Sequence, residues 1–358
     1  MALSNTLGRF NPIGRSAGIA GGAVALLAVG AAAGLAAENL VSRRVRRPDF
    51  ASNEPYGSLH VPGIELVTTD GTTLHVEIDE PASPGCPSLV FCHGYALTSD
   101  SWHFQRRDLR RVGRLVFWDQ RGHGHSGRGL DYTIATIAGD LARVLEAVPD
   151  DGPVVLVGHS MGGMTIMELA AIQPELFGTR VQGVALLATS SGGLAQVPLA
   201  LPGAPGRALR RVAPSFARGV LSATPRLLDG WERASDLAFL LTKQYSFGSE
   251  VPGEVTEFVA RQIMGTPLEV IAEFLEAFDD HDTAAALARL NHVETLVMVG
   301  ASDRLTPPSH SSAIVRKVPG AEFDVLPDTG HLIMLERYDE VNDRLRDLAA
   351  RVSRNART

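Results

Sequence analysis

The sequence predicts an α/β protein with a mostly parallel central sheet flanked by helices, and with a helical cap inserted after the sixth strand. From residue 64 onward, short apolar runs typical of buried strands alternate with the spacing of amphipathic helices. Strands and helices that alternate in this way build a parallel sheet covered on both faces. Between residues 191 and 289 the alternation stops. Only helix-like segments broken by proline and glycine remain there, which indicates an insertion over the sheet.

The individual elements follow from the apolar runs in chain order. Two strands at 64–69 and 73–78 flank Asp70-Gly71, a hairpin signal. The other predicted strands are 88–92, 114–118, 154–157, 184–187, 295–299 and 322–326. The predicted helices are 101–112, 134–148, 161–172 and 332–352. These elements place the α/β core at residues 60–190 and 290–355, the cap at 191–289, and a leader at 1–48.

Length and charge limit the function classes. The chain has 358 residues, enough for one large α/β domain with an insertion. Its formal net charge is −7, so it offers no basic field for nucleic acid, and we expect no nucleic-acid partner. The two cysteines, Cys86 and Cys92, exclude a disulfide framework. Cys92 ends an apolar run, where a cysteine is typically a small buried hydrophobe.

The leader contains an uncharged segment, residues 17–37, that is long enough to cross a bilayer as a helix. More arginines follow the segment than precede it, which favours keeping the α/β domain on the cytoplasmic side. We therefore predict a membrane-anchored protein whose α/β domain is cytoplasmic. A cleaved signal peptide, with export, and a flexible leader on a cytoplasmic protein are the alternatives.

Ser160 is the predicted nucleophile. It stands in Gly158-His159-Ser160-Met161-Gly162, directly after an apolar strand and before a helix. This is the context of a nucleophile elbow, where flanking glycines are needed because a Cβ would clash with the neighbouring chain. Ser16 stands in a second Gly-x-Ser-x-Gly run, but no strand precedes it, so that copy is a chance match.

A serine nucleophile needs a base, and the base needs a carboxylate that orients it. Asp303 follows the strand predicted at 295–299, and His331 follows the strand predicted at 322–326. Both therefore lie at the carboxyl edge of the sheet with Ser160, in the chain order Ser, Asp, His. The sequence predicts Ser160, Asp303 and His331 as a catalytic triad.

An oxyanion hole requires two N–H donors beside the nucleophile. We expect one from Met161, directly after Ser160. The other should come from Tyr95, in the loop after the strand at 88–92, where Gly94 permits the backbone to turn.

With these motifs the chain resembles the α/β-hydrolase superfamily, in particular its capped, esterase- and lipase-like serine hydrolases. The resemblance covers residues 63–352. It rests on Cys92-His93-Gly94-Tyr95, Asp119-Gln120-Arg121-Gly122-His123-Gly124-His125-Ser126, the Ser160 elbow and the Asp303/His331 pair. The resemblance implies that the second motif braces the loops around the site. One departure is Ala96, where many members of the family carry proline.

We expect neither a metal nor a cofactor. Four histidines gather in these motifs, but they lie on separate loops without the spacing of metal ligands. They are His93, His123, His125 and His159.

The predicted activity is cleavage of a carboxylic ester through an acyl-enzyme on Ser160, with a small, apolar ester as substrate. The same triad also serves cofactor-free haloperoxidases (perhydrolases), C–C bond hydrolases, lactonases and thioesterases. The non-enzymatic alternative is a binding module of the same fold.

We expect the aromatic and leucine residues of the cap to pack it onto the sheet, the alternative being an apolar acyl pocket. They are Trp231, Phe239, Leu240, Leu241, Phe247, Phe258, Phe274 and Phe278. The sequence indicates no oligomeric state.

Overall fold

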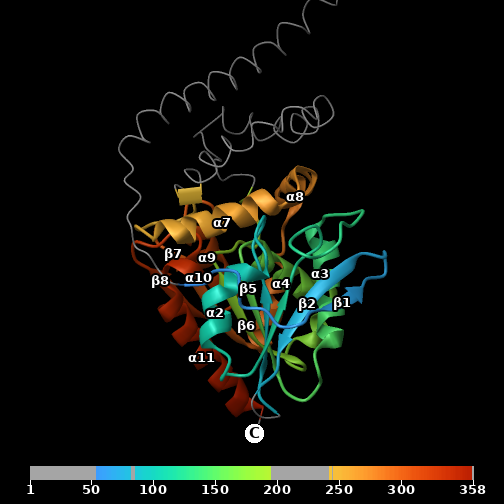
Figure 1. The fold of residues 1–358 in the computed structure, drawn as a ribbon. Coiled ribbons are helices and arrows are strands. Elements are labelled where there is room, and N and C mark those ends of the chain that lie inside the picture. Colours follow the sequence, from blue (N-terminus) through green and yellow to red (C-terminus); the bar gives the residue numbers. More distant parts are fainter. Residues whose placement is uncertain (1–53, 82–84, 195–241, 244, 357–358) are drawn as a thin grey trace, which may run out of the picture. The chain divides into compact units, whose positions relative to one another are not determined.

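The computed structural model describes residues 54–81, 85–194, 242–243 and 245–356. At its centre lies an eight-stranded sheet with the strand order β1-β2-β4-β3-β5-β6-β7-β8 (Figure 1). The strands are β1 (Ile64–Val67), β2 (Thr73–Asp79), β3 (Ser88–Cys92), β4 (Arg114–Trp118), β5 (Val154–His159), β6 (Val181–Leu187), β7 (Glu294–Gly300) and β8 (Glu322–Leu326).

The sheet is parallel from β4 to β8, and antiparallel only where β1 and β2 join it at one edge. The β1–β2 hairpin closes through the N–H of Thr68, which donates to the carbonyl of Thr72 at 2.9 Å. Gly71 lies in this turn with a φ of +84°, a conformation that favours glycine. The predicted fold class and the predicted hairpin are both confirmed.

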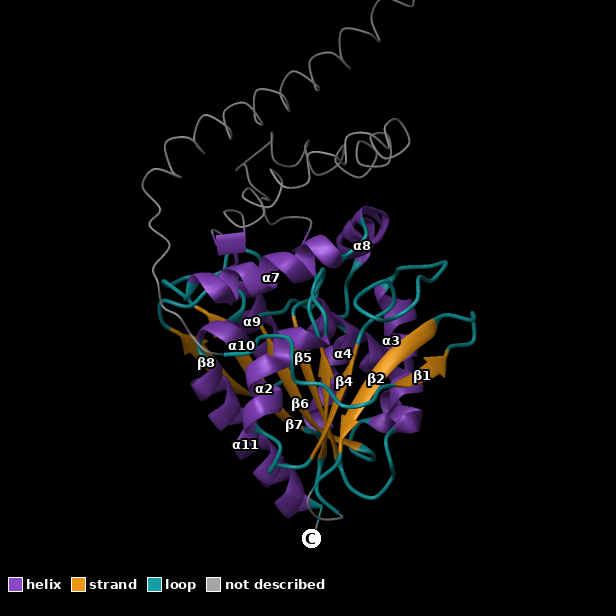
Figure 2. Ribbon diagram, viewed as in Figure 1, coloured by secondary structure: helices purple, strands orange, loops and turns teal. Residues whose placement is uncertain are grey.

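Helices cover both faces of the sheet (Figure 2). They are α2 (His103–Asp108), α3 (Ile134–Ala147), α4 (Met161–Ile172), α7 (Gly253–Gly265), α8 (Leu268–Asp280), α9 (Pro308–Val315), α10 (Ile333–Glu336) and α11 (Tyr338–Asn355), with short 3-10 turns η2 (Ser99–Trp102), η3 (Pro174–Leu176) and η6 (Ala286–His292).

Side chains alternate across the central strands, which explains why β3 reads as one continuous apolar run. Leu89 and Phe91 pack with residues of α2 and α11 on one face. Val90 and Cys92 pack with residues of α3 and α4 on the other. Cys92 is fully buried, and burial raises the pKa of its thiol to about 12, so it is the buried hydrophobe that the sequence predicts.

Two predicted helices differ from the structure. The helix predicted at 101–112 is the 3-10 turn η2 followed by the short α2. The helix predicted at 332–352 is broken at Arg337 into α10 and α11. In α10, Ile333, Met334 and Leu335 are all buried although they are consecutive. One face of a regular helix cannot bury three consecutive side chains, so this turn is set by its surroundings.

The cap follows the sixth strand, as predicted. Its described helices α7 and α8 lie between β6 and β7 in the chain and run across one end of the sheet (Figure 1). Residues 195–241 lie outside the described residues, so the limits of the cap and core stay predictions. Residues 17–37 of the leader also lie outside them. None of the helices that the structure describes has the length and apolar character needed to cross a membrane.

Candidate active site

Ser160 occupies a sharp turn between β5 and α4, with φ = 52° and ψ = −116°. Such a conformation is strained for a residue with a side chain, and it persists only where neighbours hold it. The N–H of Ser160 donates to the carbonyl of Leu187 at 3.0 Å, and Thr189 Oγ1 donates to the carbonyl of Ser160 at 2.7 Å. A Cβ on Gly162 would lie 2.0 Å from the carbonyl oxygen of Cys92. The elbow therefore needs its glycine, as the sequence analysis expects.

Asp303 and His331 come together at the ends of β7 and β8. Asp303 Oδ2 accepts a hydrogen bond from His331 Nδ1 at 2.8 Å, and both residues are almost completely buried. Asp303 Oδ1 accepts from the N–H groups of Leu305 (2.8 Å) and Thr306 (2.9 Å). Burial opposes ionisation of Asp303, but the charge of His331 and these hydrogen bonds outweigh it and hold the pKa of the carboxyl below its ordinary value.

Thr306 is a residue of this site that the sequence reasoning missed. Its Oγ1 donates to Asp303 Oδ2 at 2.9 Å and lies 3.3 Å from His331 Nδ1. A signal was available, because a hydroxyl residue three positions after an aspartate in a turn is the spacing of a local side-chain hydrogen bond.

His159 links the elbow to His331. Its Nε2–H donates to the main-chain carbonyl of His331 at 3.0 Å, and the two ring centroids are 4.7 Å apart. Burial, together with the nearby His331, lowers the pKa of His159 to about 3, so its ring is neutral. Sequence reasoning considered this histidine only as a metal ligand. In the structure it instead ties the residue directly before Ser160 to the main chain of His331. No hydrogen bond joins Ser160 Oγ to His331 Nε2 in the described part of the chain.

The two residues predicted as oxyanion donors also lie at this edge. Met161 is the first residue of α4, where helix N–H groups lack an acceptor within the helix. Tyr95 lies in the loop of residues 93–99, here called the β3 loop. Among the described residues, neither N–H donates to a backbone carbonyl. Ala96, the departure from the family pattern, has a φ of +56°, which proline cannot adopt.

Two of the clustered histidines serve the loops rather than a metal. His93 Nε2 accepts the N–H of Gln120 at 2.9 Å while its Nδ1–H donates to the carbonyl of Gly94 at 2.8 Å. His123 Nε2 accepts the N–H of Ala96 at 3.1 Å, and its Nδ1–H donates to the carbonyl of Arg121 at 3.0 Å. Both nitrogens of each ring are occupied, which leaves no lone pair for a metal.

The described cap aromatics pack as the sequence analysis expects. Phe247, Phe258 and Phe274 are buried in apolar clusters with core residues, and Phe278 is half-buried against the cluster that contains Phe274. Trp231, Phe239, Leu240 and Leu241 lie outside the described residues.

Comparisons with known proteins agree with this architecture. A model of the alpha/beta hydrolase fold matches residues 87–338. The dihydrolipoyllysine-residue acetyltransferase component of an acetoin cleaving system from Pseudomonas putida is 28% identical over 274 residues, 74% of this chain. The chain spans only 64% of the length of that relative. A putative carbamate hydrolase of Klebsiella pneumoniae is 27% identical over 74% of this chain and 91% of its own length.

A malate-bound thermophilic esterase from Thermogutta terrifontis superposes with a TM-score of 0.65 at 26% identity, covering 82% of this chain and 100% of the esterase. The family model spans well over half of the chain, and the topology around Ser160 agrees with it. This chain therefore belongs to the alpha/beta hydrolase fold family.

Proposed function

We propose that this protein is a serine hydrolase that cleaves a carboxylic ester through an acyl-enzyme on Ser160. The observation that carries the proposal is the buried Asp303–His331 hydrogen bond, made at Nδ1, beside a strained Ser160 elbow. A carboxylate on Nδ1 fixes the tautomer in which Nε2 accepts a proton, which a general base requires. A histidine with a purely structural role would not need a buried carboxylate on its Nδ1 next to a nucleophile elbow.

In the proposed reaction, Ser160 Oγ attacks the ester carbonyl while His331 Nε2 takes the hydroxyl proton. The N–H groups of Tyr95 and Met161 stabilise the oxyanion of the tetrahedral intermediate. His331 then gives the proton to the departing alcohol, which leaves an acyl group on Ser160. Water, deprotonated by His331, hydrolyses this acyl-enzyme and restores the free serine.

Two similarities support ester cleavage among the reactions open to such a triad. The superposed Thermogutta protein is an esterase, and the Klebsiella relative is named a putative carbamate hydrolase, which also implies attack at an acyl carbon. We propose a small-molecule, apolar ester as the substrate.

The test uses a fluorophosphonate probe and an activated ester on the purified full chain. We expect stoichiometric labelling and a burst of alcohol release in the wild type, and neither in Ser160→Ala. Labelling that persists in Ser160→Ala would refute the assigned nucleophile. Folded wild type that takes up no label would instead favour the binding-module reading. Thioester, lactone and peroxide-dependent halogenation assays run beside the ester panel separate the alternative chemistries.

Membrane attachment through residues 17–37 is a separate proposal. It is supported by the uncharged apolar segment and by the arginines after it. Fractionation of the full chain tests it. Recovery in the membrane pellet after a high-salt wash is expected, and recovery of the intact chain in the supernatant would overturn it.

A further inference from the structure

The β3 loop lies between the sheet and the cap and is held from both sides. On the sheet side, the N–H of Ala96 donates to His123 Nε2 at 3.1 Å. The N–H of Ser99 donates to Asp119 Oδ1 at 2.8 Å. Both acceptors belong to the loop after β4, which Arg121 anchors to the core.

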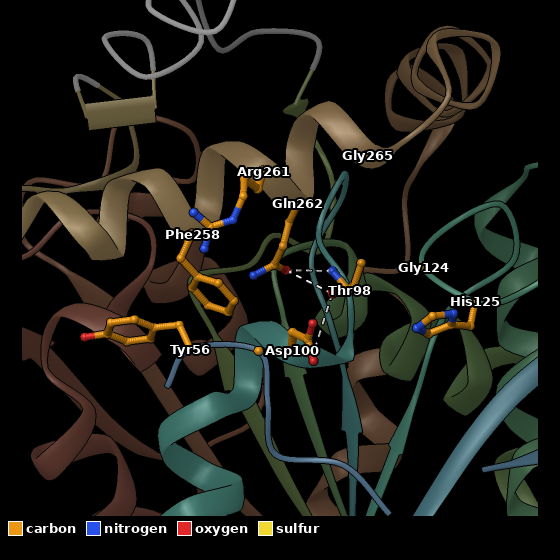
Figure 3. Close-up of a pocket in the computed structure, with 10 residues that line it drawn as sticks. Tyr56, Thr98, Asp100, Gly124, His125, Phe258, Arg261, Gln262 and Gly265 are labelled. Carbon is orange, nitrogen blue, oxygen red and sulfur yellow. Dashed lines mark hydrogen bonds between the residues drawn. The ribbon is translucent and has the colours of Figure 1, made fainter. Parts of the chain in front are cut away.

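On the cap side, the loop is held by two different helices. Tyr95 Oη donates to the carbonyl of Ile271 in α8 at 2.5 Å. Gln262 in α7 accepts two hydrogen bonds at its Oε1, from the N–H of Thr98 at 3.0 Å and from Thr98 Oγ1 at 3.2 Å. Figure 3 shows Gln262 reaching from α7 down to Thr98. The cap thus holds residues 95 and 98, and the loop after β4 holds residues 96 and 99.

The orientation of the Gln262 amide is fixed by its partner. The N–H of Thr98 can only donate, so the Gln262 atom facing it is the acceptor oxygen. Gln262 Nε2 has no partner in the described part of the chain although the residue is only 7% exposed. It borders a pocket of about 360 Å³ that Tyr56, Asp100 and Phe258 also line (Figure 3). The hydrogen bonds of the Gln262 side chain therefore all go to Thr98.

The β3 loop depends on such support because its backbone is strained. Ala96 adopts a φ of +56°, and a residue with a side chain pays for that conformation unless its surroundings impose it. The cap holds two of these four residues of the loop, Tyr95 and Thr98. Loss of the cap ties would allow the loop to relax and would move the Tyr95 N–H, one residue away from Ala96.

We propose that Gln262, and Tyr95 through its hydroxyl, are positioning residues that tie the cap helices to the oxyanion-binding loop. The position of the cap then determines the orientation of the Tyr95 N–H toward the oxyanion. Catalysis is therefore efficient only when the cap is docked on the β3 loop. This inference rests on the proposed ester hydrolysis. Neither side-chain group touches the reacting atoms. Each acts through the backbone of the β3 loop.

The central variant is Gln262→Met, which keeps the length of the side chain but removes the acceptor. Misplacing one oxyanion donor should lower kcat about 10-fold with KM little changed, since the donor acts in the transition state. Tyr95→Phe should lower kcat in the same direction. Gln262→Glu keeps an acceptor for both Thr98 donors and should recover most of the rate. Arg261→Met is the matched control, because Arg261 is exposed on the same helix and has no hydrogen bond or ion pair within the described residues.

Amide hydrogen exchange gives a readout that does not need hydrolysis. Gln262→Met should accelerate exchange of the amides at residues 95–99, and Arg261→Met should not. Unchanged exchange, or faster exchange with an unchanged kcat, would overturn the positioning role. So would a Gln262→Glu variant as slow as Gln262→Met. If the wild type hydrolysed no ester, the proposed function would fail, while exchange would still decide whether the cap holds the loop.

Discussion

Two buried carboxylates near the carboxyl edge of the sheet each hold a basic side chain, but they hold it differently. Asp140 grips Arg121 with both oxygens, at 2.6 Å from Nε and 2.7 Å from Nη2. Asp303 holds His331 by one nitrogen only, at 2.8 Å. The first pair fixes a permanent charge between helix α3 and the loop after β4. The second orients a ring and leaves Nε2, the proposed general base, without a hydrogen-bond partner among the described residues.

The surroundings of the two carboxylates reinforce this difference. Asp303 also receives two N–H groups and a hydroxyl from its own turn, which together with His331 keep the pKa of its carboxyl below the ordinary value. Arg121 has further partners in Asp70 and in the carbonyl of Asp131, so its guanidinium is held from several sides. A bidentate pair with supporting contacts braces a fold, whereas a single hydrogen bond to a titratable ring permits proton transfer.

The largest expected effect comes from Asp303→Asn. The amide keeps an acceptor for Leu305 and Thr306, but its N–H₂ group faces His331 Nδ1 and forces the ring into the wrong tautomer. We expect kcat/KM for an activated ester to fall about 10,000-fold, as for a triad that has lost its orienting carboxylate. The melting temperature should show that the variant is folded. A folded variant within about 10-fold of the wild type would refute the role of Asp303.

Asp140→Asn should have the opposite effect to Asp303→Asn, a loss of stability with the activity largely kept. Breaking a buried ion pair leaves an uncompensated charge, and we expect a loss of about 3 kcal/mol in the free energy of unfolding, with Asp70 retaining part of the Arg121 charge. Urea denaturation measures this loss. Steady-state kinetics below the unfolding transition should give a kcat within a few-fold of the wild type. A stable but inactive variant would contradict the division between bracing and catalytic carboxylates.

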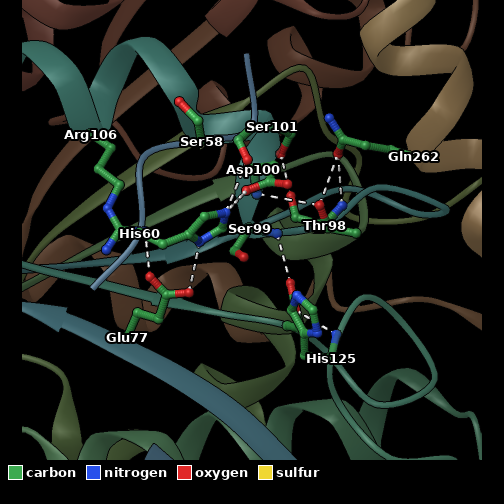
Figure 4. Close-up of polar contacts among 12 residues, drawn as sticks. Ser58, His60, Glu77, Thr98, Ser99, Asp100, Ser101, Arg106, His125 and Gln262 are labelled. Carbon is green, nitrogen blue, oxygen red and sulfur yellow. Dashed lines mark hydrogen bonds and ion pairs between the residues drawn. The ribbon is translucent and has the colours of Figure 1, made fainter. Parts of the chain in front are cut away.

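A third buried carboxylate, Glu77, tests the bracing role through pH. It pairs with Arg106 at 2.7 Å, and accepts from His60 Nδ1 at 2.9 Å and from the N–H of Val61 at 3.0 Å (Figure 4). Burial alone would raise the pKa of Glu77, but the Val61 N–H and Arg106 outweigh it and lower the pKa to about 2. A carboxyl whose pKa is lowered by folding stabilises the protein above its unfolded pKa, and this contribution is lost as pH falls through the folded pKa.

Glu77→Gln should therefore lower the free energy of unfolding by about 2–3 kcal/mol at pH 7. The difference from the wild type should shrink as pH falls from about 4.5 toward 2. Urea titrations at pH 7, 5, 4 and 3 measure it. A difference independent of pH would mean that packing, and not the charge of Glu77, is responsible.

The sequence predicts the part of this arrangement that depends on local order. Ser160, Asp303 and His331 each follow an apolar strand, and parallel strands carry their ends to one edge, so the three positions follow from the pattern. The structure brings Asp303 and His331 into contact, and His159, the residue before Ser160, hydrogen-bonds to the main chain of His331.

Contacts between distant segments could not be predicted in the same way. Gln262 meets Thr98 across 164 positions of the chain, and nothing in the pattern of α7 tells which face meets the β3 loop. The prediction of one continuous helix over 332–352 is wrong for a similar reason. The buried turn before Arg337 is set by its packing neighbours and not by the periodicity of the sequence. Ala96 could be predicted only in part. The sequence marks it as a departure from proline, but only the structure gives the positive φ that explains the departure.

The smallest effect on the free energy of unfolding is expected from a solvent-exposed ion pair. Such a pair shows what charge pairing contributes when the carboxylate is not buried. Arg143 and Glu146 pair on the surface of α3 at 2.7 Å, with side chains 39% and 67% exposed. Solvent screens such a pair, and holding two long side chains together has an entropic cost, so Glu146→Gln should change the free energy of unfolding by less than about 0.5 kcal/mol. Urea denaturation in low and in high salt measures the change. A loss as large as that of Asp140→Asn would show that charge pairing stabilises this fold irrespective of burial, and the contrast between Asp140 and Asp303 would then need another cause.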